Sequence, residues 1–153
     1  MNIRNIKDSD KQSLTKLVSM MIGDSDRDEV ANEVVNDFYN NKLFVTIVTE
    51  NEGKVNGYLS YKSEPFEGGN SVGEIVFLGV DNDSRKQGIG KELVTHIEHF
   101  SKEKNIRKLY VKTSPQNINA VRFWVKQGYE FEARLKDFNA EDYDAYLMGK
   151  KLT

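Results

Sequence analysis

The sequence predicts a single α/β (α+β) domain organised around a mixed β-sheet. Strand-like and helix-like segments interleave, the first half contains two adjacent strands joined by a short turn, and the second half alternates strand, helix, strand, helix and strand. The 153 residues are one domain's worth of chain, and no interdomain linker, internal repeat or low-complexity tract divides them. We therefore expect one domain over residues 1–153.

The first half of the chain reads as a strand, two helices and a hairpin. Asp8 and Ser9 are helix-start residues, and apolar residues follow them at helical spacing. Asn51, Glu52 and Gly53 separate two apolar runs, which is typical of a hairpin turn. The expected elements are a strand at 3–6, a helix that ends at Ile22 before a break at 23–26, a helix at 27–40, strands at 43–50 and 55–61, and a loop at 64–71.

The second half begins with residues 74–80, which are nearly all apolar, as in a central strand buried on both faces. Gly128 is a natural C-terminal stop for the helix before it. The expected elements are a strand at 74–80, a helix from about Ile89 to Lys104, a strand at 109–112, a helix at 117–126, and strands at 129–134 and 145–151 with the polar segment 135–144 as a loop between them.

Composition narrows the class of protein. Hydrophobic content of 38% and charged content of 30% fit a soluble globular chain, and a net charge of -2 argues against nucleic acid or an anionic membrane as partner. The absence of cysteine excludes disulfides, thiolate metal sites and a cysteine acyl-enzyme. No apolar run approaches the ~18 residues of a membrane span, and the N-terminus lacks the apolar run of a signal peptide. We expect a cytoplasmic protein.

The most informative motif is a basic glycine loop between the strand at 74–80 and the helix after it. Arg85, Gly88 and Gly90 form an R-x-x-G-x-G pattern, and Lys86 and Lys91 add positive charge. Glycines let a ligand lie against bare backbone, and the start of the following helix points free N–H groups and its positive dipole end at the same spot. The loop therefore predicts a receptacle for a diphosphate.

Two familiar phosphate loops fit this motif badly. A dinucleotide fingerprint needs a third glycine where Leu93 stands, and a Walker loop needs Ser or Thr where Glu92 follows Lys91. ATP binding through this loop is therefore an unfavoured reading. The R-x-x-G-x-G loop instead resembles the acetyl-CoA signature of the GNAT superfamily of N-acetyltransferases.

A second motif strengthens the resemblance. Residues 117–129 are similar to the GNAT pattern N-x-x-A-x-x-F-Y-x-x-x-G-F, with matches at Asn117, Ala120, Phe123 and Gly128 and an aromatic residue at Tyr129. The resemblance covers roughly residues 72–131. It implies a mixed, mostly antiparallel sheet of about six or seven strands, flanked by about four helices and splayed between the fourth and fifth strands, with acetyl-CoA as cosubstrate and no metal.

The resemblance also implies a binding mode for acetyl-CoA. The pantetheine arm would pair like an extra strand, and backbone amides of the loop would hold the diphosphate. The residues implied in acetyl-CoA binding are Leu78, Gly79, Val80, Arg85, Lys86, Gln87, Gly88, Ile89, Gly90, Lys91, Asn117, Ala120, Phe123 and Trp124. Amides near Leu78 or Gly79 would polarise the thioester carbonyl as an oxyanion hole does, and Asn117 also reads as a simple helix cap.

Glu74 is the candidate general base. A glutamate at the matching position is the base in the histone acetyltransferase branch of the superfamily, and a carboxylate at the start of a buried strand can accept a proton near neutrality. The alternative is an ordinary strand-end glutamate that faces solvent. Trp124 replaces the tyrosine that serves many members as general acid, and an indole N–H has no useful acidity. Tyr129 and Tyr143 are the substitute acids to consider, with Tyr146 behind them and Tyr129 also expected in the core.

The amine acceptor is the least defined partner. Acidic residues gather near 24–29 and 137–144, where GNAT acceptors enter, which favours a cationic amine or a lysine or N-terminal amine of a peptide; plain solvated charge is the alternative reading. His96 and His99 complete no metal motif. The chain is thus interpreted as an N-acetyltransferase that uses direct transfer in a ternary complex, or else as a non-catalytic acyl-CoA-binding module. A homodimer is possible for this family.

Overall fold

The computed structural model describes residues 1–22, 27–64 and 71–152 of the chain. Its helices are α1 (Lys11–Ser19), α2 (Arg27–Asn40), α3 (Ile89–Glu103) and α4 (Ile118–Lys126), with short 3-10 helices η1 (Asp8–Asp10) and η2 (Asn82–Ser84). Its strands are β1 (Asn2–Asn5), β2 (Phe44–Asn51), β3 (Lys54–Glu64), β4 (Ser71–Val80), β5 (Ile106–Thr113), β6 (Glu130–Ala140) and β7 (Tyr143–Lys151).

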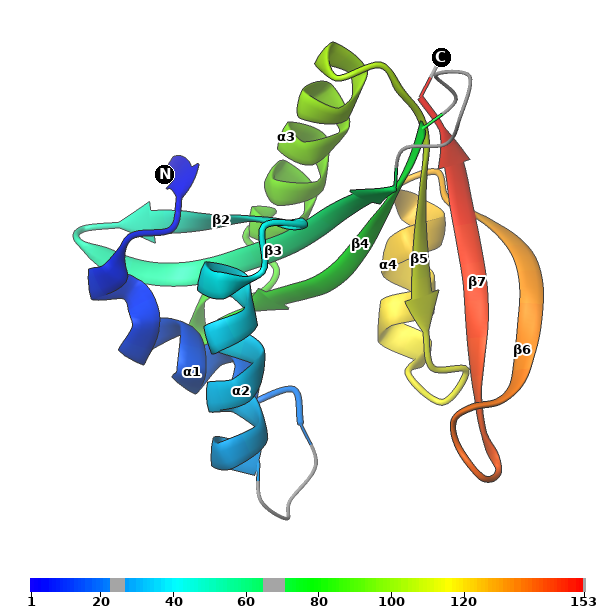
Figure 1. Cartoon of the computed structure of the whole chain (residues 1–153), viewed down its shortest axis with the longest axis horizontal. Helices are drawn as coiled ribbons and strands as arrows, with labels where there is room; N and C mark the ends of the chain where they lie inside the picture. Colours follow the sequence, from blue (N-terminus) through cyan, green and yellow to red (C-terminus); the bar gives the residue numbers. More distant parts are fainter. Residues whose placement is uncertain (23–26, 65–70, 153) are drawn as a thin grey trace. The chain divides into compact units, whose positions relative to one another are not determined.

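The described strands form a 7-stranded mixed sheet with the order β1-β2-β3-β4-β5-β7-β6 (Figure 1). The pair β4–β5 is parallel, while β1–β2, β2–β3, β5–β7 and β6–β7 are antiparallel. The parallel register ends at Ile75 and Val111, before either strand ends, which is consistent with a splay after the fourth strand. The predicted fold class, a mixed and mostly antiparallel sheet with four helices, is confirmed.

The chain forms two compact units. The first comprises Met1–Lys62 and Phe77–Ile97, and the second comprises Ser63–Val76 and Glu98–Thr153. Strand β4 and helix α3 each contribute one part to each unit. The expectation of one domain over residues 1–153 stays a prediction.

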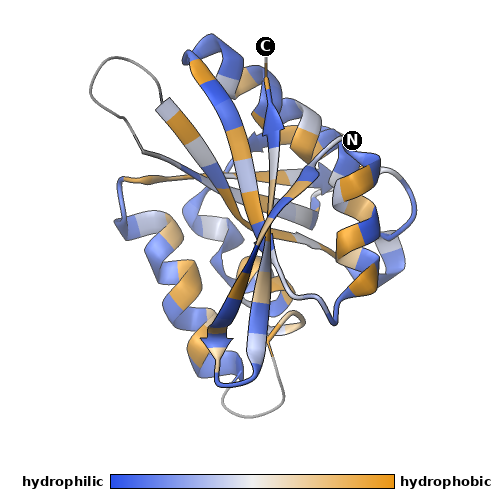
Figure 2. Ribbon diagram, turned by 90° about the vertical axis from the view of Figure 1, so that its right-hand side faces the viewer, coloured by the Kyte–Doolittle hydropathy of each residue, from blue (hydrophilic) through white to orange (hydrophobic). Residues whose placement is uncertain are grey.

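The first unit has a core between helices α1 and α2 and strands β2 and β3. Apolar residues at spacings of three and four place one face of each helix in this core. Burial of each large side chain contributes about 1.5–3 kcal/mol. Figure 2 shows hydrophobic residues beside hydrophilic ones along the helices. The buried members are Leu14, Leu17, Val18, Ala31, Val35, Phe38, Val48, Val55 and Tyr58.

The hairpin between β2 and β3 turns at Glu52 and Gly53. Both residues have positive φ, +50° and +78°, and Asn51 pairs with Lys54 on either side of them. Two central residues with positive φ match the right-handed twist of the strands. The turn predicted from Asn51–Gly53 is confirmed, and β3 extends beyond its predicted end.

The second unit buries residues of β5 and β7 together with aromatic side chains near α4. Trp124 and Tyr129 are 4% and 2% exposed, and their ring centroids lie 5.0 Å apart. Gly128 between α4 and Tyr129 has φ +84°, and its N–H donates to Val125 O at 3.0 Å, so the predicted helix stop is confirmed. The other buried residues here include Leu109, Val111, Ala145 and Met148.

The predicted loop at 135–144 is wrong, because β6 continues to Ala140 and β7 begins at Tyr143. Strand β6 is the last strand in the sheet order, and most of its residues are exposed. Its sequence therefore lacks the alternation of apolar and polar residues from which a strand could be predicted. Asp144 holds the extended hairpin: its carboxylate accepts the N–H of Asp137 at 2.9 Å and a short hydrogen bond from Arg134 Nε.

Two further predictions concern the segment between α1 and α2 and the loop before β4. The break at 23–26, with its acidic Asp24 and Asp26, and residues 65–70 of the predicted loop lie outside the described residues. Helix α1 ends at Ser19 rather than at Ile22. Among the helices that the structure describes, none has the length and apolar character needed to cross a bilayer.

Candidate functional site

The glycine loop of the first unit connects the end of β4 to α3. After η2, Lys86 and Gly88 both have left-handed backbone conformations, with φ of +64° and +83°. A Cβ added at Gly88 would meet nothing within 4 Å, so the loop backbone is open there and the glycine is required by its φ rather than by crowding. The bare backbone expected from the glycines is therefore present at Gly88.

Helix α3 begins at Ile89 and presents its first amides to this loop. Its first-turn hydrogen bond runs from Glu92 N to Gly88 O at 3.0 Å. The amides of Ile89, Gly90 and Lys91 therefore have no acceptor inside the helix, and they lie at its positive dipole end. This is the backbone arrangement that binds phosphate oxygens in proteins.

Charged side chains border the same loop. Arg85, Lys86 and Lys91 are exposed, and Arg85 Nε donates to Val80 O at 3.3 Å. Gln87 Nε2 donates to Asp83 O at 3.3 Å across the turn. The predicted diphosphate residues thus belong to one short segment, with three cations and the helix start on it, and the segment fits the chemistry of a diphosphate.

The end of β4 beside this loop is closely packed. Gly79 is buried, and a Cβ on it would overlap the ring of Tyr58 and lie 3.0 Å from Met21 Sδ. Tyr58 is fully buried, and its hydroxyl donates to Met21 Sδ at 2.9 Å. Burial raises the pKa of Tyr58 above its ordinary value. Glycine is therefore required at 79 by space, whereas Leu78 and Val80 are half-buried.

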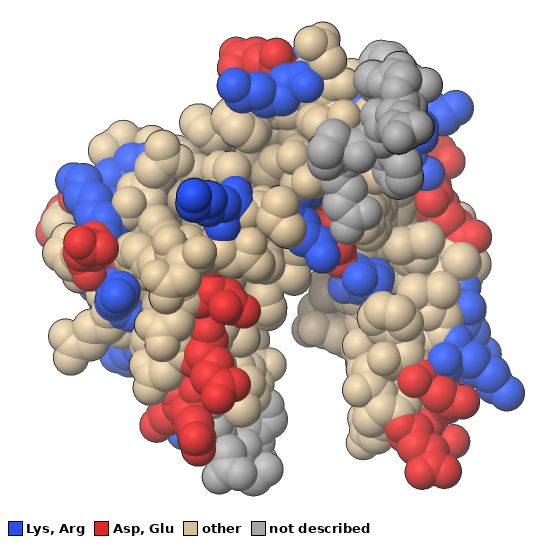
Figure 3. Space-filling model, in the orientation of Figure 1, with Lys and Arg blue, Asp and Glu red and all other residues tan. Residues whose placement is uncertain are grey.

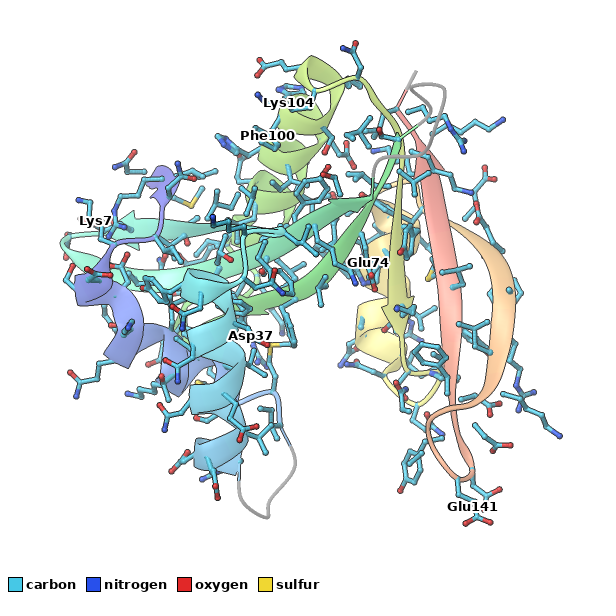
Figure 4. The ribbon with its side chains drawn as sticks, viewed as in Figure 1. Lys7, Asp37, Glu74, Phe100, Lys104 and Glu141 are labelled. Atoms are coloured by element: carbon cyan, nitrogen blue, oxygen red, sulfur yellow. The ribbon has the colours of Figure 1, made fainter. Side chains whose placement is uncertain are left out.

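Glu74 lies in the second unit and has two partners on β5. It is 4% exposed, its Oε1 lies 2.8 Å from Lys112 Nζ, and its Oε2 accepts a hydrogen bond from Tyr110 Oη at 3.2 Å. The parallel register puts Tyr110 directly opposite Glu74. Figure 4 labels Glu74 among the side chains beside β4 and β5. Glu74 is therefore a buried, ion-paired carboxylate rather than a solvent-facing one.

Helix α4 carries the second sequence motif. Asn117 caps the helix, because its Oδ1 accepts the N–H of Ala120 at 3.1 Å. Ala120 and Phe123 are half-buried, while Trp124 is buried and packs at 5.0 Å on both Phe123 and Tyr129. The capping reading of Asn117 is confirmed, and Trp124 contributes to the core of the second unit.

The two candidate acids differ in environment. Tyr129 is 2% exposed, and burial, with Glu98 as a further cause, raises the pKa of its phenol well above the ordinary value. A phenol with a raised pKa gives up its proton less readily to a thiolate. Tyr143 is 58% exposed at the start of β7, and Tyr146 packs edge-on against Phe131 at 5.0 Å. The expectation that Tyr129 packs in the core is confirmed.

Acidic side chains gather over α2 and, separately, over the β6–β7 turn (Figure 3). Glu141 of that turn is labelled in Figure 4. Asp28 and Glu29 are exposed in the first turn of α2. In the hairpin, Asp144 is 7% exposed, and its hydrogen bonds from Asp137 N and Arg134 hold its pKa below the ordinary value. Asp144 therefore maintains the hairpin, while Glu141 is exposed to solvent.

His96 and His99 are exposed on α3. Across residues 1–22, 27–64 and 71–152, no three His, Asp or Glu side chains are arranged to hold a metal ion. Sequence reasoning missed Lys112 and Tyr110 as neighbours of Glu74. The available signal was the alternation of Lys108, Tyr110 and Lys112, which places the three on one face of β5.

Comparison with known proteins agrees with both motifs. The profile of the acetyltransferase (GNAT) family matches residues 12–129. An uncharacterised N-acetyltransferase of Methanocaldococcus jannaschii, MJ1530, is 30% identical over 105 residues, which are 68% of this chain and 64% of that protein. The match therefore spans less than two thirds of this relative's length.

Solved structures share the fold over the whole chain. A protein of Desulfovibrio desulfuricans assigned to the GNAT family has a TM-score of 0.86 at 19% identity, with 99% of each chain covered. An aminoglycoside 6'-N-acetyltransferase complexed with coenzyme A has a TM-score of 0.79 at 19% identity, with 100% of this chain and 98% of that one covered. At this level of identity the likeness concerns the fold.

Proposed function

The chain belongs to the acetyltransferase (GNAT) family, and on that premise we propose that it transfers an acetyl group from acetyl-CoA to a primary amine. The observation that carries the proposal is the glycine loop, where left-handed Lys86 and Gly88 precede the free first-turn amides of α3. Exposed Arg85 and Lys91 add the positive charge that a diphosphate requires.

The roles of the chain's residues follow from their chemistry. Acetyl-CoA supplies an acetyl group activated as a thioester. The loop amides and Arg85 bind the diphosphate, and the amide of Gly79 is the candidate donor to the thioester carbonyl oxygen. Glu74 accepts the proton that the acceptor amine loses as its nitrogen bonds to the carbonyl carbon and the bond to sulfur breaks. Transfer is direct, because no cysteine is present to carry the acetyl group.

The departing thiolate needs little assistance. With a thiol pKa of about 8.5, a thiolate is a tolerable leaving group near neutrality. Trp124 donates an N–H but cannot act as an acid, and burial makes Tyr129 a weaker acid. Of the two proposed acids, Tyr143 is the exposed one, and we retain it as the proposed donor with water as the alternative.

For the acceptor we propose a small cationic amine or the lysine or N-terminal amine of a peptide. The exposed carboxylates Asp28, Glu29 and Glu141 support a cationic acceptor, because clustered negative charge raises the local concentration of cations. One solved structure with the same fold is an aminoglycoside 6'-N-acetyltransferase complexed with coenzyme A, and that specificity belongs to that protein.

The second candidate function is a non-catalytic acyl-CoA-binding module. It is favoured by Trp124, which replaces the acidic tyrosine expected from the motif, and by the burial of Tyr129. The two candidate functions differ in turnover. An enzyme and a binding module would both bind acetyl-CoA, but only the enzyme would release free CoA faster when an amine is added.

The test is thiol release from acetyl-CoA with a panel of amines, combined with mass spectrometry of the acetylated product. Glu74→Gln is expected to reduce turnover more at low pH than at high pH, because an amine that is already neutral at high pH needs no base. Glu132→Gln is the matched control, since Glu132 pairs with Lys108 on the same strand that carries the partners of Glu74. Equal loss at all pH values would remove Glu74 from the role of base, and absence of turnover with every amine would favour the binding module.

A further inference from the structure

Strand β5 carries two side chains that both bind the carboxylate of Glu74. Lys112 Nζ lies 2.8 Å from Oε1, and Tyr110 Oη lies 3.2 Å from Oε2. The two residues are two positions apart, so they extend from the same face of the strand. Each oxygen of the carboxylate therefore has its own partner, and the carboxylate plane is fixed from one side.

Lys112 is itself held in place. Its ammonium lies 5.0 Å from the centre of the Phe138 ring, which belongs to β6, and its side chain is 30% exposed. A cation over an aromatic ring face is attracted by the ring's negative face. The Lys112 ammonium thus has two contacts, one with Glu74 and one with Phe138.

The burial of Glu74 makes its contacts with Lys112 and Tyr110 important for the carboxylate. Its side chain is 5% exposed, and burial of a charged group is costly unless the group is paired with a counter-charge and hydrogen-bonded. A general base must also direct a carboxylate oxygen at the proton that it accepts. The Lys112 ammonium, 2.8 Å from Oε1, supplies such a counter-charge to Glu74.

We infer that Lys112 is a positioning residue for the acetyl transfer: together with Tyr110 it fixes the direction of the carboxylate oxygens of Glu74. The inference rests on the proposed role of Glu74 as general base. Lys112 acts through Glu74 and needs no contact with either substrate. The predicted consequence is a loss in kcat without a loss in acetyl-CoA affinity.

The chain contains a matched control on the same strand. Lys108 pairs with Glu132 at 2.5 Å, and their side chains are 23% and 34% exposed. This ion pair has the same chemical composition, but its carboxylate is far more exposed than that of Glu74. Exposed ion pairs contribute little, so removal of Lys108 has no comparable effect.

The experiment compares Lys112→Met, Lys112→Arg, Tyr110→Phe and Lys108→Met in steady-state acetylation of the best amine. Lys112→Met keeps the length and packing of the side chain and removes its charge. We expect it to lower kcat by about tenfold or more, with the factor of about 10²–10⁴ that general-base catalysis supplies as the upper limit. Lys112→Arg restores most of the loss, Tyr110→Phe gives a smaller loss, and Lys108→Met stays within about twofold of the unmodified protein. Calorimetry should give an unchanged dissociation constant for acetyl-CoA in all four variants.

A double variant separates positioning from a structural role. If Lys112 acts through Glu74, Glu74→Gln combined with Lys112→Met is no slower than Glu74→Gln alone. The inference would be overturned if the double variant lost activity by the product of the two single-variant losses. It would also be overturned if Lys112→Met were as active as the unmodified protein while Glu74→Gln was slow. Either result would leave the proposed function intact. Full activity of Glu74→Gln would overturn both the base and its positioning residue. If Lys112→Met does not fold, failure of the folded Lys112→Arg variant to retain activity overturns the inference.

Discussion

Replacement of Gly79 by alanine should destabilise the first unit by overpacking it. The added Cβ would overlap the ring of Tyr58, which is 0% exposed and cannot move into solvent, and would lie 3.0 Å from Met21 Sδ. Extra methyl groups in packed cores cost about 1–3 kcal/mol. Gly79 has no positive φ, so alanine fits the backbone and recovers about 0.4–1 kcal/mol by restricting the unfolded chain. We expect a net loss of about 1–2 kcal/mol.

The assay is urea unfolding followed by circular dichroism, for Gly79→Ala in the unmodified chain and in a Tyr58→Leu background. Leucine removes the ring carbon that the new methyl group would overlap, so the cost of Gly79→Ala should fall to about zero in that background. An equal cost in both backgrounds would refute the reasoning, because the loss would then have nothing to do with Tyr58. Stability equal to that of the unmodified chain in the single variant would refute it as well.

Two further predictions concern ion pairs. Arg4 donates two hydrogen bonds to Asp10, and these bonds lower the pKa of the Asp10 carboxyl. A carboxyl whose pKa is lower in the folded state than in the unfolded state stabilises the fold above the unfolded pKa of about 3.9, and this stabilisation disappears as the pH falls. Urea unfolding should therefore show Asp10→Asn to be destabilising at pH 7 and progressively less so below about pH 4, and a difference independent of pH would contradict this. Lys150 Nζ lies 2.8 Å from both carboxylate oxygens of Glu98, and Lys150→Met should cost about 1–2 kcal/mol after allowance for partial exposure, or about 2–8 °C in Tm by calorimetry. An unchanged Tm would show that the pair contributes nothing.

Features fixed by neighbours in the chain could be predicted from the sequence. The left-handed Gly88, the start of α3 at Ile89, the Asn117 cap and the Gly128 stop each depend on only a few consecutive residues. The bounds of α2 agree with the prediction because its apolar spacing and its first-turn acids agree with each other. These local rules predict the left-handed Gly88 and the helix start of the glycine loop, whereas the left-handed conformation of Lys86 was not predicted.

Features fixed by strand register could not be predicted. Glu74 pairs with Tyr110 and Lys112 only because β4 and β5 align Glu74 with Tyr110, and no local pattern specifies that alignment. The length of β6 could not be predicted for a related reason. Its exposed face tolerates polar residues, and the side chain that holds the hairpin together, Asp144, reads in the sequence as one more acidic loop residue.

The central claim is that the glycine loop binds acetyl-CoA, and calorimetric titration of the purified protein with acetyl-CoA, CoA and ATP tests it most directly. Saturable binding of acetyl-CoA is predicted, with weaker binding of ATP and a clear loss of acetyl-CoA affinity in Arg85→Ala, whose guanidinium lies on the loop. Absence of acetyl-CoA binding, or tighter binding of ATP than of CoA, would contradict the assignment of this loop and with it the proposed acetyltransferase.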